Sequence, residues 1–73
     1  MDYYFVQAHY PNGRAENYVV KTDGGSKKAR EVVEAAEPHA DRVEVETAAP
    51  ERVDAAYPDL QEDYPLWMSN TSG

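Results

Sequence analysis

The sequence predicts a small α+β domain of ββαβ topology, followed by an acidic and aromatic C-terminal arm. Three observations support this prediction: two β-type runs flank a Pro-Asn-Gly turn, a helical stripe of apolar residues follows, and a strictly alternating run comes next. The economical arrangement is a three-stranded antiparallel sheet with the helix on one face. At 73 residues the chain forms one domain, near the lower limit for a core without further support.

The first two strands are expected to form a β-hairpin. Residues 3–10 are rich in aromatic side chains, which favour strands, and residues 17–22 resume the β pattern. The intervening Pro11-Asn12-Gly13 suits a tight turn, because proline fits its first position and Asn-Gly supplies positive φ angles. Alternate residues of the first strand form the more apolar face, which we expect to be buried: Tyr4, Val6, Ala8 and Tyr10.

A helix is predicted from Lys27 to about Glu37. Ser26 suits its N-cap and Pro38 ends it, and its apolar residues recur at i, i+3, i+4 and i+7. Residues 42–47 then alternate valine with charged or polar residues, which is typical of a half-buried antiparallel strand. The predicted core contains Tyr4, Val6, Tyr18, Val20, Ala29, Val32, Val33, Ala36, Val43 and Val45.

The composition changes in the last third of the chain. We predict a core domain over residues 1–49, an acidic, Tyr/Pro-rich arm over 50–68 and a disordered tail over 69–73. In the arm, two Tyr-Pro dipeptides recur seven residues apart, at 57–58 and 64–65. Two occurrences are too few to define a repeat architecture.

The predicted core is small and needs further cover. Burying a valine contributes about 1.5–2 kcal/mol, against a backbone ordering cost of about 1–2 kcal/mol per residue. We therefore expect the arm to pack on the open sheet face or on a partner, or that face to form a homodimer. The arm residues expected to cover the core are Leu60, Tyr64, Leu66 and Trp67. Pro50 followed by acids also suits the start of one or two helical turns over residues 50–56.

Charge is unevenly distributed along the chain. There are 14 acids and seven lysines and arginines, which give a net charge of −7. Residues 1–33 have a net charge of +1, whereas residues 34–73 contain ten acids and two arginines, a net charge of −8. Nucleic acids and anionic membranes require a basic footprint, so neither is an expected direct ligand. The difference between the halves indicates one surface specialised for a partner.

Several classes of protein are excluded by what the sequence lacks. Without cysteine, the chain has no disulfide framework, thiol catalysis or thiolate metal site. Apolar runs reach only four residues, far below the roughly 20 that a membrane-spanning helix needs. Met1-Asp2 leads directly into an aromatic run without a basic segment, so no signal peptide is visible and a cytoplasmic location is expected.

Catalytic chemistry has little support in the sequence. His9 and His39 have no third nitrogen or sulfur ligand for a metal site, and Ser26 is explained as a helix cap without a neighbouring base. Gly24-Gly25 before two lysines suits an anion at a helix N-terminus, but the spacing is not that of a phosphate-binding loop. We expect no catalytic residue, no metal site and no cofactor, and therefore a protein that is not an enzyme.

The arm and the third strand predict a protein-binding module that occupies the basic surface of a nucleic-acid-handling protein. Glu44 and Glu46 should project roughly 6.5–7 Å apart, close to the spacing of about 7 Å between alternate phosphates of one DNA strand. The acids of the arm are expected to extend these two into one row of carboxylates that imitates a nucleic-acid backbone, and aromatic anchors accompany them. The predicted partner-binding residues are Glu44, Glu46, Glu51, Asp54, Tyr57, Asp59, Glu62, Asp63, Tyr64 and Trp67.

In size, charge and order of elements the chain resembles small phage-encoded inhibitors, which include anti-CRISPR proteins and DNA mimics. This resemblance implies an inhibitor or modulator of a host protein, and it assigns a role to no individual residue. The alternative is a small structural or regulatory domain from a high-salt cytoplasm. Its acidity would then serve solubility alone, and the chain has only three lysines, as such proteins favour.

Overall fold

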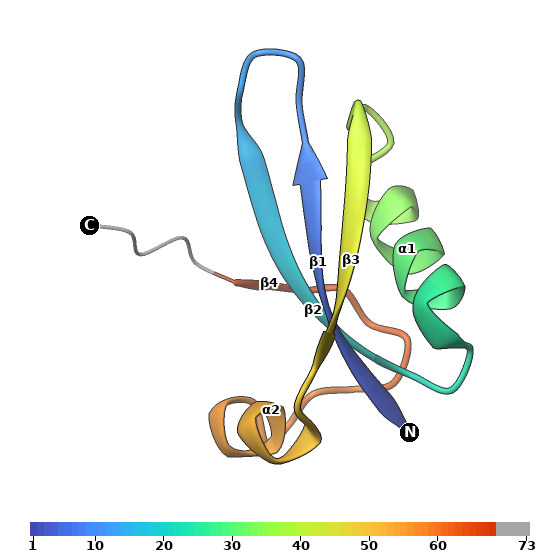
Figure 1. Cartoon of the computed structure of the whole chain (residues 1–73), viewed down its shortest axis with the longest axis vertical. Coiled ribbons are helices and arrows are strands. Elements are labelled where there is room, and N and C mark those ends of the chain that lie inside the picture. The colour runs from blue at the N-terminus through green and yellow to red at the C-terminus, as the bar shows by residue number, and fades with distance from the viewer. Residues whose placement is uncertain (69–73) are drawn as a thin grey trace.

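This computed structural model describes residues 1–68 of the chain. These residues form one sheet of four antiparallel strands and two helices (Figure 1). In chain order the elements are β1 (Asp2–His9), β2 (Ala15–Thr22), α1 (Gly25–Ala36), β3 (Arg42–Ala48), α2 (Pro50–Ala56) and β4 (Leu66–Met68). The strands lie side by side in the order β3-β1-β2-β4. The predicted tail of residues 69–73 lies outside the described residues.

The predicted α+β class is confirmed, and α2 matches the one or two helical turns expected over residues 50–56, but the prediction of a three-stranded sheet is wrong. The sheet has a fourth strand, and both β4 and α2 come from the segment predicted as an arm. β4 pairs with β2 through Asn17 to Val19, at the edge of the hairpin that faces away from β3. The fourth strand was not predicted because it has only three residues, too few for an alternating pattern to be recognised.

β1 and β2 form a hairpin whose register brings the apolar residues of both strands onto the same face. Tyr4 lies opposite Val20, and Val6 lies opposite Tyr18. At the turn, the N–H of Gly13 donates to the carbonyl of Tyr10 over 3.0 Å. Gly13 has a φ of 90°, which glycine adopts without the steric cost that a side chain would add.

α1 covers one face of the sheet and encloses the first hydrophobic core. The buried residues of this core are Tyr4, Val6, Ala8, Tyr18, Val20, Ala29 and Val33. Val32, Val43 and Val45 pack against it in partly buried positions, as the alternating and helical patterns predict. The prediction for Ala36 is wrong, because this residue is exposed in the last helical turn and Ala40 packs against the core instead.

The start of α1 also differs from the prediction. The helix begins at Gly25, so Ser26 lies inside the first turn and provides no capping hydrogen bond. Gly25 has a φ of 78°, a conformation that favours glycine and sets the entry into the helix. The N–H of Gly24 donates to the buried Thr22 hydroxyl over 3.1 Å, which fixes the preceding turn.

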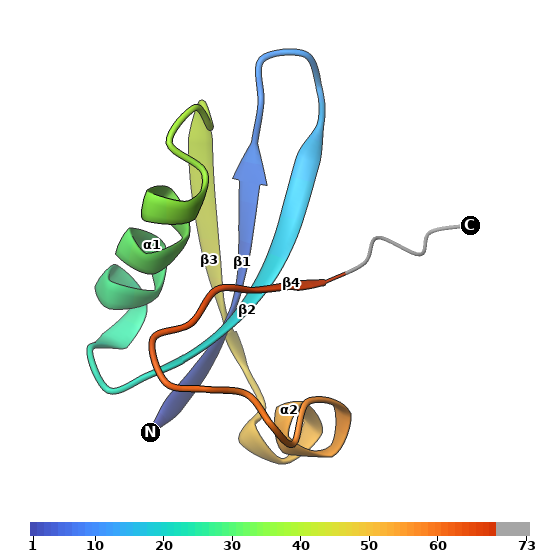
Figure 2. The ribbon, with the colours of Figure 1, turned by 180° about the vertical axis from the view of Figure 1, so that it is seen from behind.

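A second hydrophobic core lies on the opposite face of the sheet, under α2 and β4. Its buried residues are Tyr3, Val19, Val53 and Leu60, and Phe5, Ala48, Tyr57, Leu66 and Met68 pack against them. Seen from behind, the chain leaves α2, passes the lower end of β2 and reaches β4 (Figure 2). The two cores face opposite ways because successive residues of β1, such as Tyr3 and Tyr4, alternate between the faces.

Only part of the predicted cover over this second face is present. Leu60 is buried and Leu66 is half-buried, as expected, but Tyr64 and Trp67 remain 51% and 54% exposed. Trp67 lies between Leu66 and Met68 in β4, and both neighbours pack into the second core. Its side chain therefore projects to the other face of the sheet, because strand residues alternate.

Candidate functional site

The predicted partner-binding residues lie on β3, on α2 and in the segment that runs from the end of α2 through β4, and the acids of β3 and of that segment mark opposite edges of the sheet. Glu44 and Glu46 lie on β3, one edge strand, whereas Glu62 and Asp63 lie beside Lys21 of β2, on the side of the sheet that β4 extends. β3 and β4 are separated by three inter-strand spacings of about 4.8 Å, or about 14 Å in total. The structure thus contains two acidic edges in place of the single row of carboxylates that the sequence suggested.

The first group lies on the part of the second sheet face that α2 leaves open. A pocket of about 330 Å³ is lined there by Phe5, Val6, Gln7, Asn17, Glu44, Val45 and Glu46. Glu44 pairs with His9 at 2.8 Å and with Arg42 at 3.9 Å, and its side chain stays 56% exposed. Gln7 donates to the side-chain oxygen of Asn17 over 2.9 Å, which orients two amides beneath the glutamates.

α2 presents the next two predicted acids. Pro50 at its first position and Glu51 in its first turn favour helix formation there, because an acid stabilises the positive end of the helix dipole. Val53 anchors the helix in the second core. Asp54 accepts a hydrogen bond from the Tyr3 hydroxyl over 2.7 Å, and this bond, with burial, raises the pKa of Tyr3.

The loop between α2 and β4 holds the remaining acids and both tyrosines of the Tyr-Pro dipeptides. A pocket of about 410 Å³ in this loop is lined by Tyr57, Pro58, Asp59, Leu60, Gln61, Tyr64 and Leu66. The N–H of Tyr57 donates to the carbonyl of Val53 over 2.7 Å, and the N–H of Leu60 donates to the carbonyl of Tyr57 over 3.2 Å. The loop is therefore tied to the end of α2 by backbone hydrogen bonds.

The far end of the loop is held against β2. The N–H of Asp63 donates to the carbonyl of Lys21 over 2.7 Å, and Glu62 forms a parallel bridge with the same residue. Asp63 has a φ of 56°, in the left-handed region that aspartate tolerates better than most residues. These contacts place Asp59, Glu62 and Asp63 on the surface while Leu60 enters the second core.

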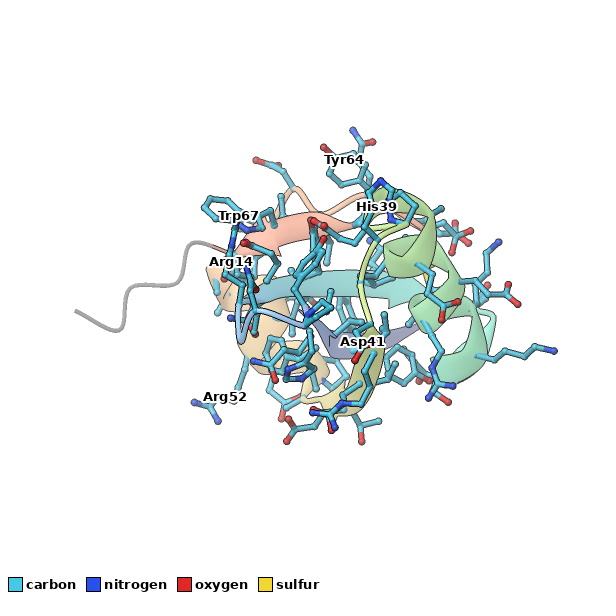
Figure 3. All side chains as sticks on the ribbon, turned by 90° about the horizontal axis from the view of Figure 1, so that it is seen from above. Arg14, His39, Asp41, Arg52, Tyr64 and Trp67 are labelled. Carbon is cyan, nitrogen blue, oxygen red and sulfur yellow. The ribbon has the colours of Figure 1, made fainter. Side chains whose placement is uncertain are left out.

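Trp67 belongs to a cluster that sequence reasoning missed. Its indole N–H donates to Glu16 over 2.7 Å, and Arg14 donates to the other oxygen of the same carboxylate over 2.5 Å. These bonds, the one from Trp67 foremost, lower the pKa of Glu16. Figure 3 shows Trp67 and Arg14 on the same side of the molecule. Because 51 residues separate Glu16 from Trp67, no local pattern in the sequence indicates this contact.

A second missed contact ties the helix to the hairpin. Both Tyr10 and Tyr18 donate their hydroxyl hydrogens to the carboxylate of Glu37, the residue that follows α1. Burial foremost, with the charge of Glu16, raises the pKa of Tyr18. The sequence signal for this arrangement is limited to one tyrosine in each half of the predicted hairpin and a glutamate at the end of the predicted helix.

Residues 1–68 contain no group of three or more histidine, cysteine, aspartate or glutamate side chains placed to hold a metal ion. In the same part of the chain, no helix is long and apolar enough to cross a bilayer. Comparisons with protein-family models, with curated proteins and with solved structures find no match to the chain.

Proposed function

We propose that this protein is a non-enzymatic binding module whose acidic surface occupies the basic surface of a nucleic-acid-handling protein. The observation that carries the proposal is the state of the carboxylates in residues 50–68, where five acids accompany one arginine. All five are exposed, and none forms an ion pair with another residue of the described part of the chain. They are Glu51, Asp54, Asp59, Glu62 and Asp63.

The charge on α1 provides an internal comparison. This helix is also exposed on its outer face, but its two glutamates are accompanied by three basic residues, Lys27, Lys28 and Arg30. Compared with α1, the segment of α2 and the loop that follows it therefore carries a large excess of negative charge. A surface of one sign attracts a partner of the opposite sign and accelerates association in a salt-dependent way.

The two acidic edges support mimicry of a nucleic acid in particular. They lie about 14 Å apart across the sheet, comparable to the width of about 12 Å of the DNA major groove. Glu44 and Glu46 would stand for phosphates of one strand, and the loop acids for phosphates of the other. In this proposal Tyr64 and Trp67, both exposed, contribute aromatic contacts beside the loop acids.

A capture experiment followed by competition tests the proposed function. The protein is immobilised on a resin and incubated with host lysate at about 0.1 M salt. The captured partner is then purified, and its binding to the protein is measured. We expect a basic partner that is released at about 0.5 M salt, where charges are strongly screened, and that duplex DNA or RNA displaces. A captured acidic protein whose binding ignores salt would overturn the proposal.

Charge reversal provides the matched test of the surface. Glu62→Lys combined with Asp63→Lys should weaken partner binding at least about tenfold, because both the attraction and the steering are lost. The control is Glu31→Lys combined with Glu34→Lys on α1, which changes the net charge equally and should have a much smaller effect. Equal losses for the two pairs would show that net charge alone, and no particular surface, controls binding.

One observation favours the second candidate, a high-salt domain whose acidity serves solubility. Exposed acids also occur away from the proposed surface, at Asp2, Asp23 and Asp41. In that case the protein should unfold at low salt and recover its structure in molar KCl, as circular dichroism would report. A protein that is fully folded at about 0.1 M salt counts against this candidate.

A further inference from the structure

We propose that the pocket in the loop between α2 and β4 binds an arginine side chain of the partner protein. This inference rests on the proposed function and identifies which group of a basic partner is recognised. It also gives a role to the two Tyr-Pro dipeptides, whose spacing of seven residues brings both tyrosines into the wall of one pocket.

The pocket has the size and the stability of a preformed site. Its volume of about 410 Å³ lies within the range of roughly 300–1,000 Å³ that is typical of ligand pockets. Leu60, which is 7% exposed, and the half-buried Leu66 tie its wall to the second core. Because this wall is fixed by packing and by hydrogen bonds to α2, little ordering is required when a side chain enters.

The chemistry of the lining favours a cation. Two tyrosine rings, from Tyr57 and Tyr64, are combined with the carboxylate of Asp59, and no basic residue lines the pocket. Glu62 and Asp63 follow in the same loop and add negative charge. Aromatic faces attract cations through the ring quadrupole, and a carboxylate beside them supplies a charge-assisted hydrogen bond.

Arginine suits this lining better than the other candidates do. Its guanidinium group is planar, stacks on tyrosine rings and forms two parallel hydrogen bonds with a carboxylate, whereas the lysine ammonium is a strongly hydrated point charge. A neutral apolar side chain would cover Asp59 without providing a hydrogen bond, which is unfavourable. An anion would be repelled by Asp59 and its neighbours.

The test is an NMR titration of the folded protein with short peptides at low salt. The probe is acetyl-Gly-Gly-Arg-Gly-Gly-amide, and the matched peptides carry lysine or citrulline, a neutral isostere of arginine, in its place. We expect saturable shifts of the Leu60 and Leu66 backbone amides with the arginine peptide, and affinities at least about fivefold weaker for both others. Equal binding of the citrulline or lysine peptide, or no shift at these amides, would overturn the inference.

Variants of exposed residues identify the groups involved without endangering the fold. Tyr64→Leu and Asp59→Asn should each weaken the arginine peptide about fivefold, whereas Tyr64→Phe should preserve binding because the ring face remains. The control is Asp41→Asn, which changes an exposed acid that lies away from the proposed surface and does not line the pocket; it should bind the peptide like the wild type. Tyr64→Leu that binds like the wild type would contradict the proposed site.

Failure of the arginine pocket can be distinguished from failure of the proposed function. If a basic partner is captured and binds the Tyr64→Leu variant normally, the arginine pocket is wrong and the binding module stands. If the arginine peptide binds at Leu60 and Leu66 but no basic partner is captured, the pocket stands and the proposed function is wrong.

Discussion

The two faces of the sheet are covered in different ways. α1, with 12 residues, packs against β1, β2 and β3, and buries Val33 completely. α2, with seven residues, packs against β1, and the rest of the second core is completed by Leu60 of the loop and by β4. The first face is thus closed by one regular helix, and the second by three short pieces of chain.

This difference suggests a division of labour within a very small domain. The face under α1 resembles a conventional core and contains most of the large buried side chains of the hairpin. The face under α2 supports the pocket and the uncompensated acids, and the helix that covers it has only seven residues and packs against β1. Segments with few buried contacts open most easily, so we expect the second face to be the less stable one.

The largest effect is expected from Val33→Ala, on the first face. The substitution removes two buried methyl groups and leaves a cavity between α1 and the sheet, so it should lower the free energy of unfolding by about 2 kcal/mol or more. Urea denaturation would measure the loss, and hydrogen exchange should accelerate throughout β1 and β2. A loss confined to α1 would show that the first core is not the cooperative unit.

A smaller global effect is expected from Val53→Ala, which removes an equally buried valine from the second face. Because α2 has only seven residues, it can shift to fill part of the cavity, so we expect a loss of about 1 kcal/mol in the free energy of unfolding. Hydrogen exchange should accelerate selectively in α2 and β4. If both valine variants lose the same free energy of unfolding and show the same pattern of hydrogen exchange, the two faces unfold as one unit. The expected difference in their stability is then wrong.

The smallest effect is expected from Tyr3→Phe, which removes the hydrogen bond from the Tyr3 hydroxyl to Asp54 but retains the ring. Because the folded protein raises the pKa of Tyr3, the unfolded chain releases this proton first as the pH rises above about 10. Wild-type stability should therefore decline above that pH, and Tyr3→Phe should decline less steeply. Identical slopes in denaturation measured from pH 8 to 11 would contradict the assigned contact.

The buried residues of the first face could be predicted from the sequence because they follow periodic patterns within single strands and helices. Alternation places Tyr4 and Val6 on one side of a strand, and a helical period places Ala29 and Val33 on one side of a helix. Neither inference depends on knowing which distant segments meet. The exceptions, Ala36 and Ser26, lie at the ends of α1. At a helix end, a shift of one residue in the boundary decides whether a side chain caps the helix or is buried.

The second face could be predicted only in part. Its apolar residues were expected to find cover, and Leu60 and Leu66 provide it, but β4 pairs with β2 through three residues that carry no pattern of their own. The same contact decides where the candidate site lies. Since β4 joins the edge opposite β3, the loop acids and Glu44 are separated by the width of the sheet.

The edges of the sheet have a consequence for solubility. An unpaired edge strand is a template on which further chains can add, and the two outer strands here differ in how they discourage it. β3 alternates charged residues along its length, while β4 is described over the three residues Leu66–Met68. By pairing with β2, this short strand shields part of an eight-residue strand that contains Tyr18, Val19 and Val20. β4 thus occupies the backbone edge of the apolar hairpin at a place where another chain could otherwise pair, and this role does not depend on any partner.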